Sequence, residues 1–152
     1  MGNLFGVGRE APTFSLTSQD GDVITLKQYR GDWMPVLVFC SAKSVDVVKQ
    51  LTALSAAAGQ LWGLRGQLLG ICGASGVELH ELVDEAGGVG FPVMADEDGA
   101  VARRYGAWNK RTNDVQPLAC IVDRSGKLVW QGEGAEALKP AALTAAFDAV
   151  VR

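Results

Sequence analysis

Three cysteines are the side chains in this sequence best suited to nucleophilic or redox chemistry. They are Cys40, Cys72 and Cys120, and each lies in or at the end of an apolar run. A thiol attacks as its thiolate, and a helix N-terminus or a nearby cation lowers its pKa from about 8.5. An odd number of widely spaced cysteines argues against a secreted disulfide framework. The sequence has no Cys-x-x-Cys pair, which argues against a thioredoxin-type dithiol and against a zinc knuckle.

The junction after the first long apolar run is where such a thiolate would be held. Residues 36–40 predict a buried strand, and a short loop and a long helix are predicted to follow. The first N–H groups of a helix are unpaired, so a helix start stabilises an anion. Here, however, the first turn has no thiol. It contains Ser44, Val45, Asp46, Val47 and Val48.

Hydrophobic spacing predicts the elements that position these residues. Alternating segments around Asp20-Gly21 predict an N-terminal β-hairpin over 14–16 and 23–26. Apolar runs predict further strands over 35–40, 67–72, 91–94, 118–122 and 127–131. Helical spacing predicts helices over 45–64, 77–86, 100–105 and from Pro140 onward, with Ser44 as the N-cap of the first. The alternation predicts an α/β fold, a central mixed sheet with helices on both faces, in a single domain over 1–152.

Composition and charge exclude several classes of protein. The chain has 152 residues, 48% of them apolar and 20% charged, which is typical of one soluble domain with a sizeable core. A net charge of −3 argues against a general nucleic-acid binder. No apolar run approaches the ~20 residues that span a bilayer, and the chain start lacks the pattern of a signal peptide. We therefore expect no membrane association and a reducing, cytoplasmic location.

Cofactor and metal motifs are also missing from the sequence. No Gly-x-x-x-x-Gly-Lys phosphate loop is present, and the short glycine pairs lack the rest of a dinucleotide fingerprint. The single histidine, His80, precedes an acidic stretch in which Asp84 replaces the second histidine of a zinc motif. We therefore expect no cofactor and no metal.

Four ordered segments carry a more specific pattern. They are 7–16 with Ala11-Pro12-Thr13-Phe14 followed by the segment 20–31, the strand 36–39, the segment 91–106 with Phe91-Pro92, and the segment 117–127 with Ile121-Val122-Asp123. This order resembles the peroxiredoxin, or alkyl hydroperoxide reductase and thiol-specific antioxidant, family of the thioredoxin-like superfamily. The match covers nearly the whole chain. The resemblance implies a thioredoxin-like fold, thiol-dependent peroxide reduction as an antioxidant oxidoreductase, a thiol reductant as partner, and a homodimer as in many relatives.

The active-site motif of that family does not carry over. The motif is Pro-x-x-x-Thr-x-x-Cys. In one register its three fixed positions are Cys40, Ser44 and Val47, and in the other they are Ser41, Val45 and Val48. In both registers the attacking cysteine is a valine, which can neither ionise nor donate an electron pair. The resemblance therefore predicts a degenerate active site.

Two further family features meet different residues in this sequence. The family places an arginine shortly before the strand 118–122 to polarise the peroxide. This chain has Asp114 to Pro117 there, and Arg111 is the nearest arginine, out of register. Pro117 resembles the cis-proline that thioredoxin-like proteins place beside the active site, so a cis bond is compatible with this position.

Two hypotheses of function follow. In the first, the protein has lost standard peroxidase chemistry and acts by binding, with a small molecule as ligand. In the second, it is a thiol oxidoreductase in which Cys40 is a displaced nucleophile and Cys72 or Cys120 is the resolving thiol.

The strand order of the fold predicts that the three sulfurs gather at one edge of the sheet. The alternative is that all three are small buried apolar residues. Asp46 either complements the helix dipole or places its carboxylate in the thiolate position.

Overall fold

The computed structural model describes residues 7–151, and their main element is a mixed seven-stranded sheet. Its strands are β1 (Ser15–Ser18), β2 (Val23–Thr25), β3 (Met34–Ser41), β4 (Gly66–Gly73), β5 (Val93–Ala95), β8 (Leu118–Val122) and β9 (Leu128–Glu133). Their order is β2-β1-β5-β4-β3-β8-β9, and β3, β4 and β5 are parallel. The strands β6 (Trp108–Asn109) and β7 (Asp114–Val115) form a separate two-stranded hairpin.

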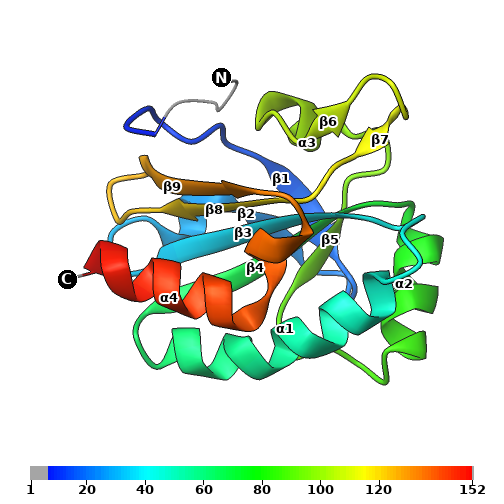
Figure 1. The fold of residues 1–152 in the computed structure, drawn as a ribbon, viewed down its shortest axis with the longest axis horizontal. Coiled ribbons are helices and arrows are strands. Elements are labelled where there is room, and N and C mark those ends of the chain that lie inside the picture. The colour runs from blue at the N-terminus through cyan, green and yellow to red at the C-terminus, as the bar shows by residue number, and fades with distance from the viewer. Residues whose placement is uncertain (1–6, 152) are drawn as a thin grey trace.

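Helices cover the two faces of the sheet unequally. They are α1 (Val47–Trp62), α2 (Gly76–Glu85), α3 (Ala100–Arg104) and α4 (Pro140–Val151), with 3-10 helices η1 (Leu26–Tyr29) and η2 (Ala135–Leu138). Figure 1 shows α1 and α4 beneath the sheet and the β6–β7 hairpin with α3 above it. The predicted α/β sheet with helices on both faces and an N-terminal β-hairpin is therefore confirmed. The second face is covered mostly by the N-terminal segment, the short α3 and the β6–β7 hairpin.

Strand β3 lies between two hydrophobic cores, and this explains why its sequence is apolar without alternation. All eight of its residues are buried. Val36, Val38 and Cys40 pack into the core beneath α1 and α4, while Leu37 and Phe39 pack into the core on the opposite face. Successive side chains of a strand point to opposite faces, so a strand covered on both faces needs apolar residues at every position.

Three details differ from the sequence-based expectations. Helix α1 begins at Val47, two residues later than expected. The β6–β7 hairpin was not predicted, because strands of two residues carry no periodic signal. All peptide bonds of the described residues are trans, including the bond before Pro117.

Two of the sequence-based expectations reach beyond the described residues. Residues 1–6, which served to exclude a signal peptide, and Arg152, the last residue of the predicted domain, lie outside the part of the chain that the structure describes. Within residues 7–151, no helix combines the length and the apolar character that crossing a bilayer requires.

Candidate functional site

The connection from β3 to α1 is the candidate site, since it is where the sequence predicts a helix start able to hold an anion. A loop over 42–46 joins Ser41, the last residue of β3, to the helix. The Ser44 Oγ accepts the backbone N–H of Asp46 at 3.3 Å, and the Ser44 carbonyl accepts that of Val47 at 3.3 Å. The N-cap of α1 is therefore Asp46, and the prediction of Ser44 as N-cap is wrong by two residues.

The Asp46 side chain does not act as a helix cap. It is exposed and accepts no capping hydrogen bond, and its backbone has φ −101° and ψ 6°. Capping residues instead have extended backbone, which turns the side chain back toward the first turn. The structure thus gives no support to a carboxylate in the thiolate position. The Asp46 charge is placed to complement the helix dipole from solvent.

In the two registers compared in the sequence, the cysteine position of the family motif falls on Val47 or Val48. Val47 is 3% exposed and belongs to the same buried cluster as Cys40 and Cys72. Val48 is partly buried and packs against that cluster, whereas Val45 is 96% exposed in the loop. The first position of α1 therefore contributes to the hydrophobic core.

Cys40 and Cys72 lie side by side beneath the start of α1. They are direct partners in the parallel register of β3 and β4, and they face the same core. Both are free thiols, with exposed fractions of 2% and 0%. The hydrogen bond with Cys40, and then burial, raise the pKa of the Cys72 thiol far above its ordinary value. Cys72 is therefore protonated at neutral pH.

Cys120 lies on the other face of the sheet, so the prediction that three sulfurs gather at one edge is wrong. It pairs with Leu37 rather than with Cys40, and this odd offset turns its side chain away. Its Sγ lies 3.8 Å from the amide nitrogen of Gln131. Burial raises the pKa of Cys120 to about 12, although the Gln131 hydrogen bond lowers it. Cys120 cannot reach Cys40 in this fold, because the sheet separates them.

A serine–aspartate pair, which sequence reasoning missed, lies at the end of β3. The Ser41 Oγ donates to Asp114 Oδ2 at 2.5 Å and accepts the backbone N–H of Lys43 at 3.1 Å. The other carboxylate oxygen, Oδ1, accepts the backbone N–H of Val115 at 2.8 Å. The bond between Ser41 and Asp114 attaches β7 to the end of β3, and the bond from Val115 fixes the Asp114 carboxylate within β7.

Strand β7 covers that edge closely. A Cβ built on Gly73 would lie 2.7 Å from Cγ2 of Val115, so only glycine fits at the end of β4. Gly73 and Asp114 are the two sequence features that could have indicated this packing. They were not recognised because the hairpin itself gave no signal.

The segment before β8 does not supply the family's peroxide-binding arginine. Arg111 is exposed in the hairpin loop, where its backbone N–H donates to Asn109 Oδ1 at 2.9 Å. Pro117 is partly buried and trans, and its carbonyl accepts the backbone N–H of Gly134 at 3.0 Å. Neither residue reproduces the role that the resemblance implies.

A groove of about 340 Å³ opens beside the first two turns of α1. It is lined by Asp46, Lys49, Gln50, Ala53, Ala135, Glu136, Leu138, Lys139 and Pro140. Leu138 is buried and forms part of the apolar lining, while Lys139 Nζ and Glu136 Oε2 form an exposed ion pair at 3.0 Å. The groove thus combines an apolar surface with both signs of charge. No cluster of three metal-ligating side chains occurs among residues 7–151.

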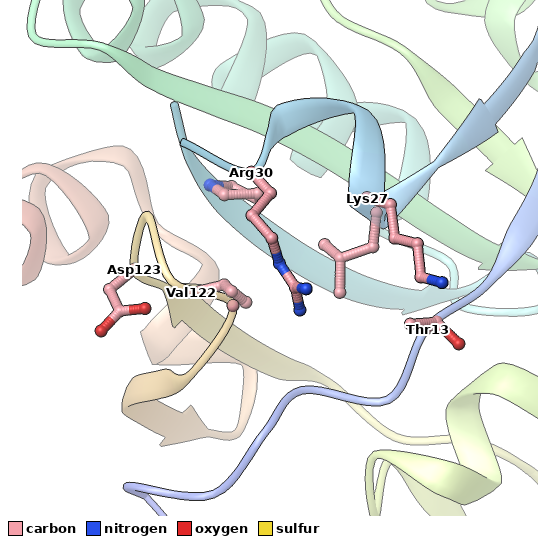
Figure 2. Close-up of a pocket in the computed structure, with 8 residues that line it drawn as sticks. Thr13, Lys27, Arg30, Val122 and Asp123 are labelled. Carbon is pink, nitrogen blue, oxygen red and sulfur yellow. The ribbon is translucent and has the colours of Figure 1, made fainter. Parts of the chain in front are cut away.

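A second cavity lies at the opposite end of β3, far from the start of α1. Figure 2 shows Lys27 and Arg30 extending toward Thr13 and Val122, while the carboxylate of Asp123 points away. Its volume, about 10 Å³, is room for a single water. Burial raises the pKa of Asp123, but hydrogen bonds from Lys127 and Ser125 outweigh this and lower it. The Asp123 carboxylate holds the adjacent turn through these hydrogen bonds, and the cavity itself is too small for a substrate.

Comparisons with known proteins agree with this architecture. The profile of the AhpC/TSA family matches residues 7–131. The chain is 24% identical to peroxiredoxin Bcp of Escherichia coli over 132 residues, covering 83% of this chain and 84% of that protein. It is 28% identical to alkyl hydroperoxide reductase E of Mycobacterium tuberculosis over 134 residues, covering 81% and 82%.

A solved structure confirms the thioredoxin-like fold. The peroxidoxin BcpB of Mycobacterium tuberculosis superposes with a TM-score of 0.76 and 19% sequence identity. The superposition covers 91% of this chain and 96% of that one. The predicted peroxiredoxin-type architecture is therefore correct.

Proposed function

This chain belongs to the AhpC/TSA family, and we propose that it is a member that has lost the standard peroxidatic step and acts by binding. The observation that carries the proposal is Val47, a buried aliphatic side chain at the first position of α1. Peroxide reduction begins with a thiolate attacking the O–O bond. A valine at this position leaves the family chemistry without its nucleophile.

The remaining cysteines do not replace that nucleophile for rapid turnover. Reactive cysteines lie in partly exposed, electropositive surroundings. Cys40, Cys72 and Cys120 are all at most 2% exposed and lie in apolar clusters. A peroxide molecule meets no exposed sulfur on the surface of the described residues.

The groove beside α1 is the proposed place of binding. Its size suits a small ligand, because such sites usually occupy about 300–1,000 Å³. Lys49 and Asp46 supply opposite charges at its rim, and Leu138 supplies an apolar surface. We propose that the ligand is a small zwitterion with an apolar body.

Leucine is a probe that matches this chemistry. Millimolar leucine should shift the NMR amide signals of residues 46–53 and 135–140, and the N-acetylated and amidated analogues should shift them less. A Lys49→Ala variant should weaken the response, while Lys110→Ala, in the exposed hairpin loop, should not. Signals in the groove that stay unchanged at the highest soluble leucine concentration would contradict this ligand class.

A peroxide assay tests the loss of peroxidase activity. The protein, a small hydroperoxide and excess dithiothreitol are incubated, and peroxide consumption is compared with that of dithiothreitol alone. We expect peroxide to be consumed at about the rate of dithiothreitol alone, because any oxidation of the buried thiols is slow. Many turnovers per chain would refute the proposal.

A second candidate function is a thiol oxidoreductase that uses Cys40 as nucleophile and Cys72 as resolving thiol. The observation in its favour is the direct pairing of these two residues in the register of β3 and β4. Under this alternative, turnover in the same assay would disappear in a Cys40→Ala variant and persist in Cys120→Ala.

A further inference from the structure

Cys40 and Cys72 form a pair that the loss of the family motif leaves unexplained. We infer that they are a redox-sensitive dithiol in which a hydroperoxide oxidises Cys40 and Cys72 then closes a disulfide between β3 and β4. This inference uses the same two thiols as the second candidate function but does not depend on that function. It requires only one oxidation per chain and no turnover.

The register of the sheet supports the bond. Neighbouring strands lie about 4.8 Å apart, and the Cα atoms of a disulfide lie about 4.4–6.8 Å apart. Cys40 and Cys72 occupy directly opposed positions, one residue before the ends of their strands, and face the same core. The backbone therefore needs little movement to link them. Cys120 is excluded as a partner by the sheet between its side chain and this pair.

The surroundings of the two thiols assign their roles. Cys72 is 0% exposed, and the hydrogen bond with Cys40 together with burial keeps it protonated by raising its pKa. Cys40 is 2% exposed and lies three residues before the exposed loop residue Lys43 along the chain. Cys72 is thus suited to hold a proton next to Cys40 and to react second.

The chemistry balances in two steps. In the first, the Cys40 sulfur attacks the terminal peroxide oxygen, the O–O bond breaks, and Cys40 becomes a sulfenic acid. The other peroxide oxygen takes the Cys40 thiol proton and leaves as an alcohol or water. In the second, the Cys72 sulfur attacks the Cys40 sulfur, a disulfide forms, and the hydroxyl leaves as water with the thiol proton. The two thiols lose two electrons, which reduce the peroxide.

Access to Cys40 is expected through opening of the first turn of α1. The N-cap Asp46 contributes no side-chain hydrogen bond, so this turn is held by backbone N–H groups and by the packing of Val47. Val47 is the residue of that turn in the same buried cluster as the thiols. On the other side, α2 begins with a complete capping box at Ser75 and keeps Leu79 over the cluster. Oxidation should therefore be slow and limited by opening at α1.

Intact-mass spectrometry and peptide mapping of the wild-type protein test the inference directly. The reduced chain is exposed to a small hydroperoxide, quenched with an alkylating agent under denaturing conditions, and digested. We expect the loss of two hydrogen masses and a peptide pair joined through Cys40 and Cys72. No linkage after exhaustive oxidation, or a linkage that includes Cys120 or a second chain, would overturn the inference.

Matched variants assign the steps. Cys40→Ala should abolish the mass change, Cys72→Ala should accumulate a trappable sulfenic acid on Cys40, and Cys120→Ala should behave as wild type. Circular dichroism verifies that each variant is folded. If a variant is unfolded, the peptide map of the wild-type protein still tests the inference. A Cys40–Cys72 disulfide without catalytic turnover would support the inference and eliminate the oxidoreductase candidate. Turnover without this disulfide would overturn the inference alone.

Discussion

Helices α1 and α2 both begin just beyond the ends of neighbouring parallel strands, yet their N-termini are built differently. At α2, the Ser75 Oγ accepts the backbone N–H of Glu78 at 3.1 Å, and Glu78 Oε1 accepts that of Ser75 at 2.9 Å. At α1, the N-cap Asp46 makes no side-chain bond, and the first helical residue, Val47, is buried. One helix start is satisfied by its own polar residues, and the other is held by packing.

This difference is informative because α1 is the helix at whose start the family holds its thiolate. A bound anion would accept the N–H groups that α2 satisfies with Ser75 and Glu78. At α1 of this chain no side chain caps the helix start, and Val47, the first helical residue, packs into the core.

Alkaline pH should produce the largest effect on the region beneath α1. The pKa of Cys72 is raised in the folded state, so its contribution to stability is complete below its unfolded pKa and is lost as pH rises above it. We expect the free energy of unfolding to fall by about 1.4 kcal/mol per pH unit above roughly pH 9 for this thiol. Cys120, raised to about 12, acts with the same sign.

Urea unfolding at a series of pH values measures this effect. Cys72→Ala should flatten the alkaline part of the plot of unfolding free energy against pH, whereas His80→Ala, at an exposed position, should leave it unchanged. An alkaline limb equally steep in Cys72→Ala and in wild type would show that Cys72 is not protected from ionisation.

The next largest effect should be the difference in unfolding free energy between truncating a side chain at the start of α1 and truncating one at the start of α2. Val47→Ala should cost about 2 kcal/mol, since the lost methyl groups leave a cavity in the core. Val77→Ala, in the first turn of α2, should change stability by less than about 0.5 kcal/mol because Val77 is 74% exposed. Chemical denaturation of both variants measures the contrast, and equal costs would mean that Val47 does not hold α1 in place.

The attachment of β7 beside these helix starts should contribute somewhat less. Asp114→Ala removes the acceptor for Ser41 and for the backbone N–H of Val115, and we expect a loss of about 1.5 kcal/mol. Glu97→Ala, an exposed acidic residue, is the matched control. Hydrogen exchange should show faster exchange at residues 108–116 in Asp114→Ala. Unchanged exchange there would mean that the carboxylate does not anchor the hairpin.

The smallest difference in stability should be the one between removing the N-cap side chain of α2 and removing that of α1. Ser75→Ala removes a cap and should cost about 1 kcal/mol, whereas Asp46→Ala should cost less than about 0.5 kcal/mol. Thermal unfolding of the two variants compares them side by side. A full capping cost for Asp46 would indicate that its carboxylate does bind the first turn in solution.

The strands and helices of the sheet could be predicted because each has a strong local pattern. Strand β8 was predicted with its observed bounds. The observed strands β3 and β4 are each one residue longer at both ends than the predicted strands. The β6–β7 hairpin could not be predicted, since its strands are only two residues long. It is bonded to the distant Ser41 and packs closely over the distant Gly73. The same absence of local signal hid Asp114 from the predicted site.

The cysteines mark the limit of sequence reasoning at the site. Placing Cys40 and Cys72 at the ends of neighbouring strands was correct, because parallel strands joined by a helix end at the same edge. Placing Cys120 with them was wrong, because the face of a strand depends on its register, and the pairing of β8 with β3 is set by contacts far apart in the chain.

The order of residue types is enough to identify the family's architecture and to show that no cysteine lies at the start of the first long helix. Both are properties of residue type and order along the chain. The folded chain was needed to show that Cys40 and Cys72 share a core, that Cys120 is separated from them, and that Ser41 is bonded to Asp114. These relations depend on register and on side-chain direction, which are fixed by packing between segments distant in sequence.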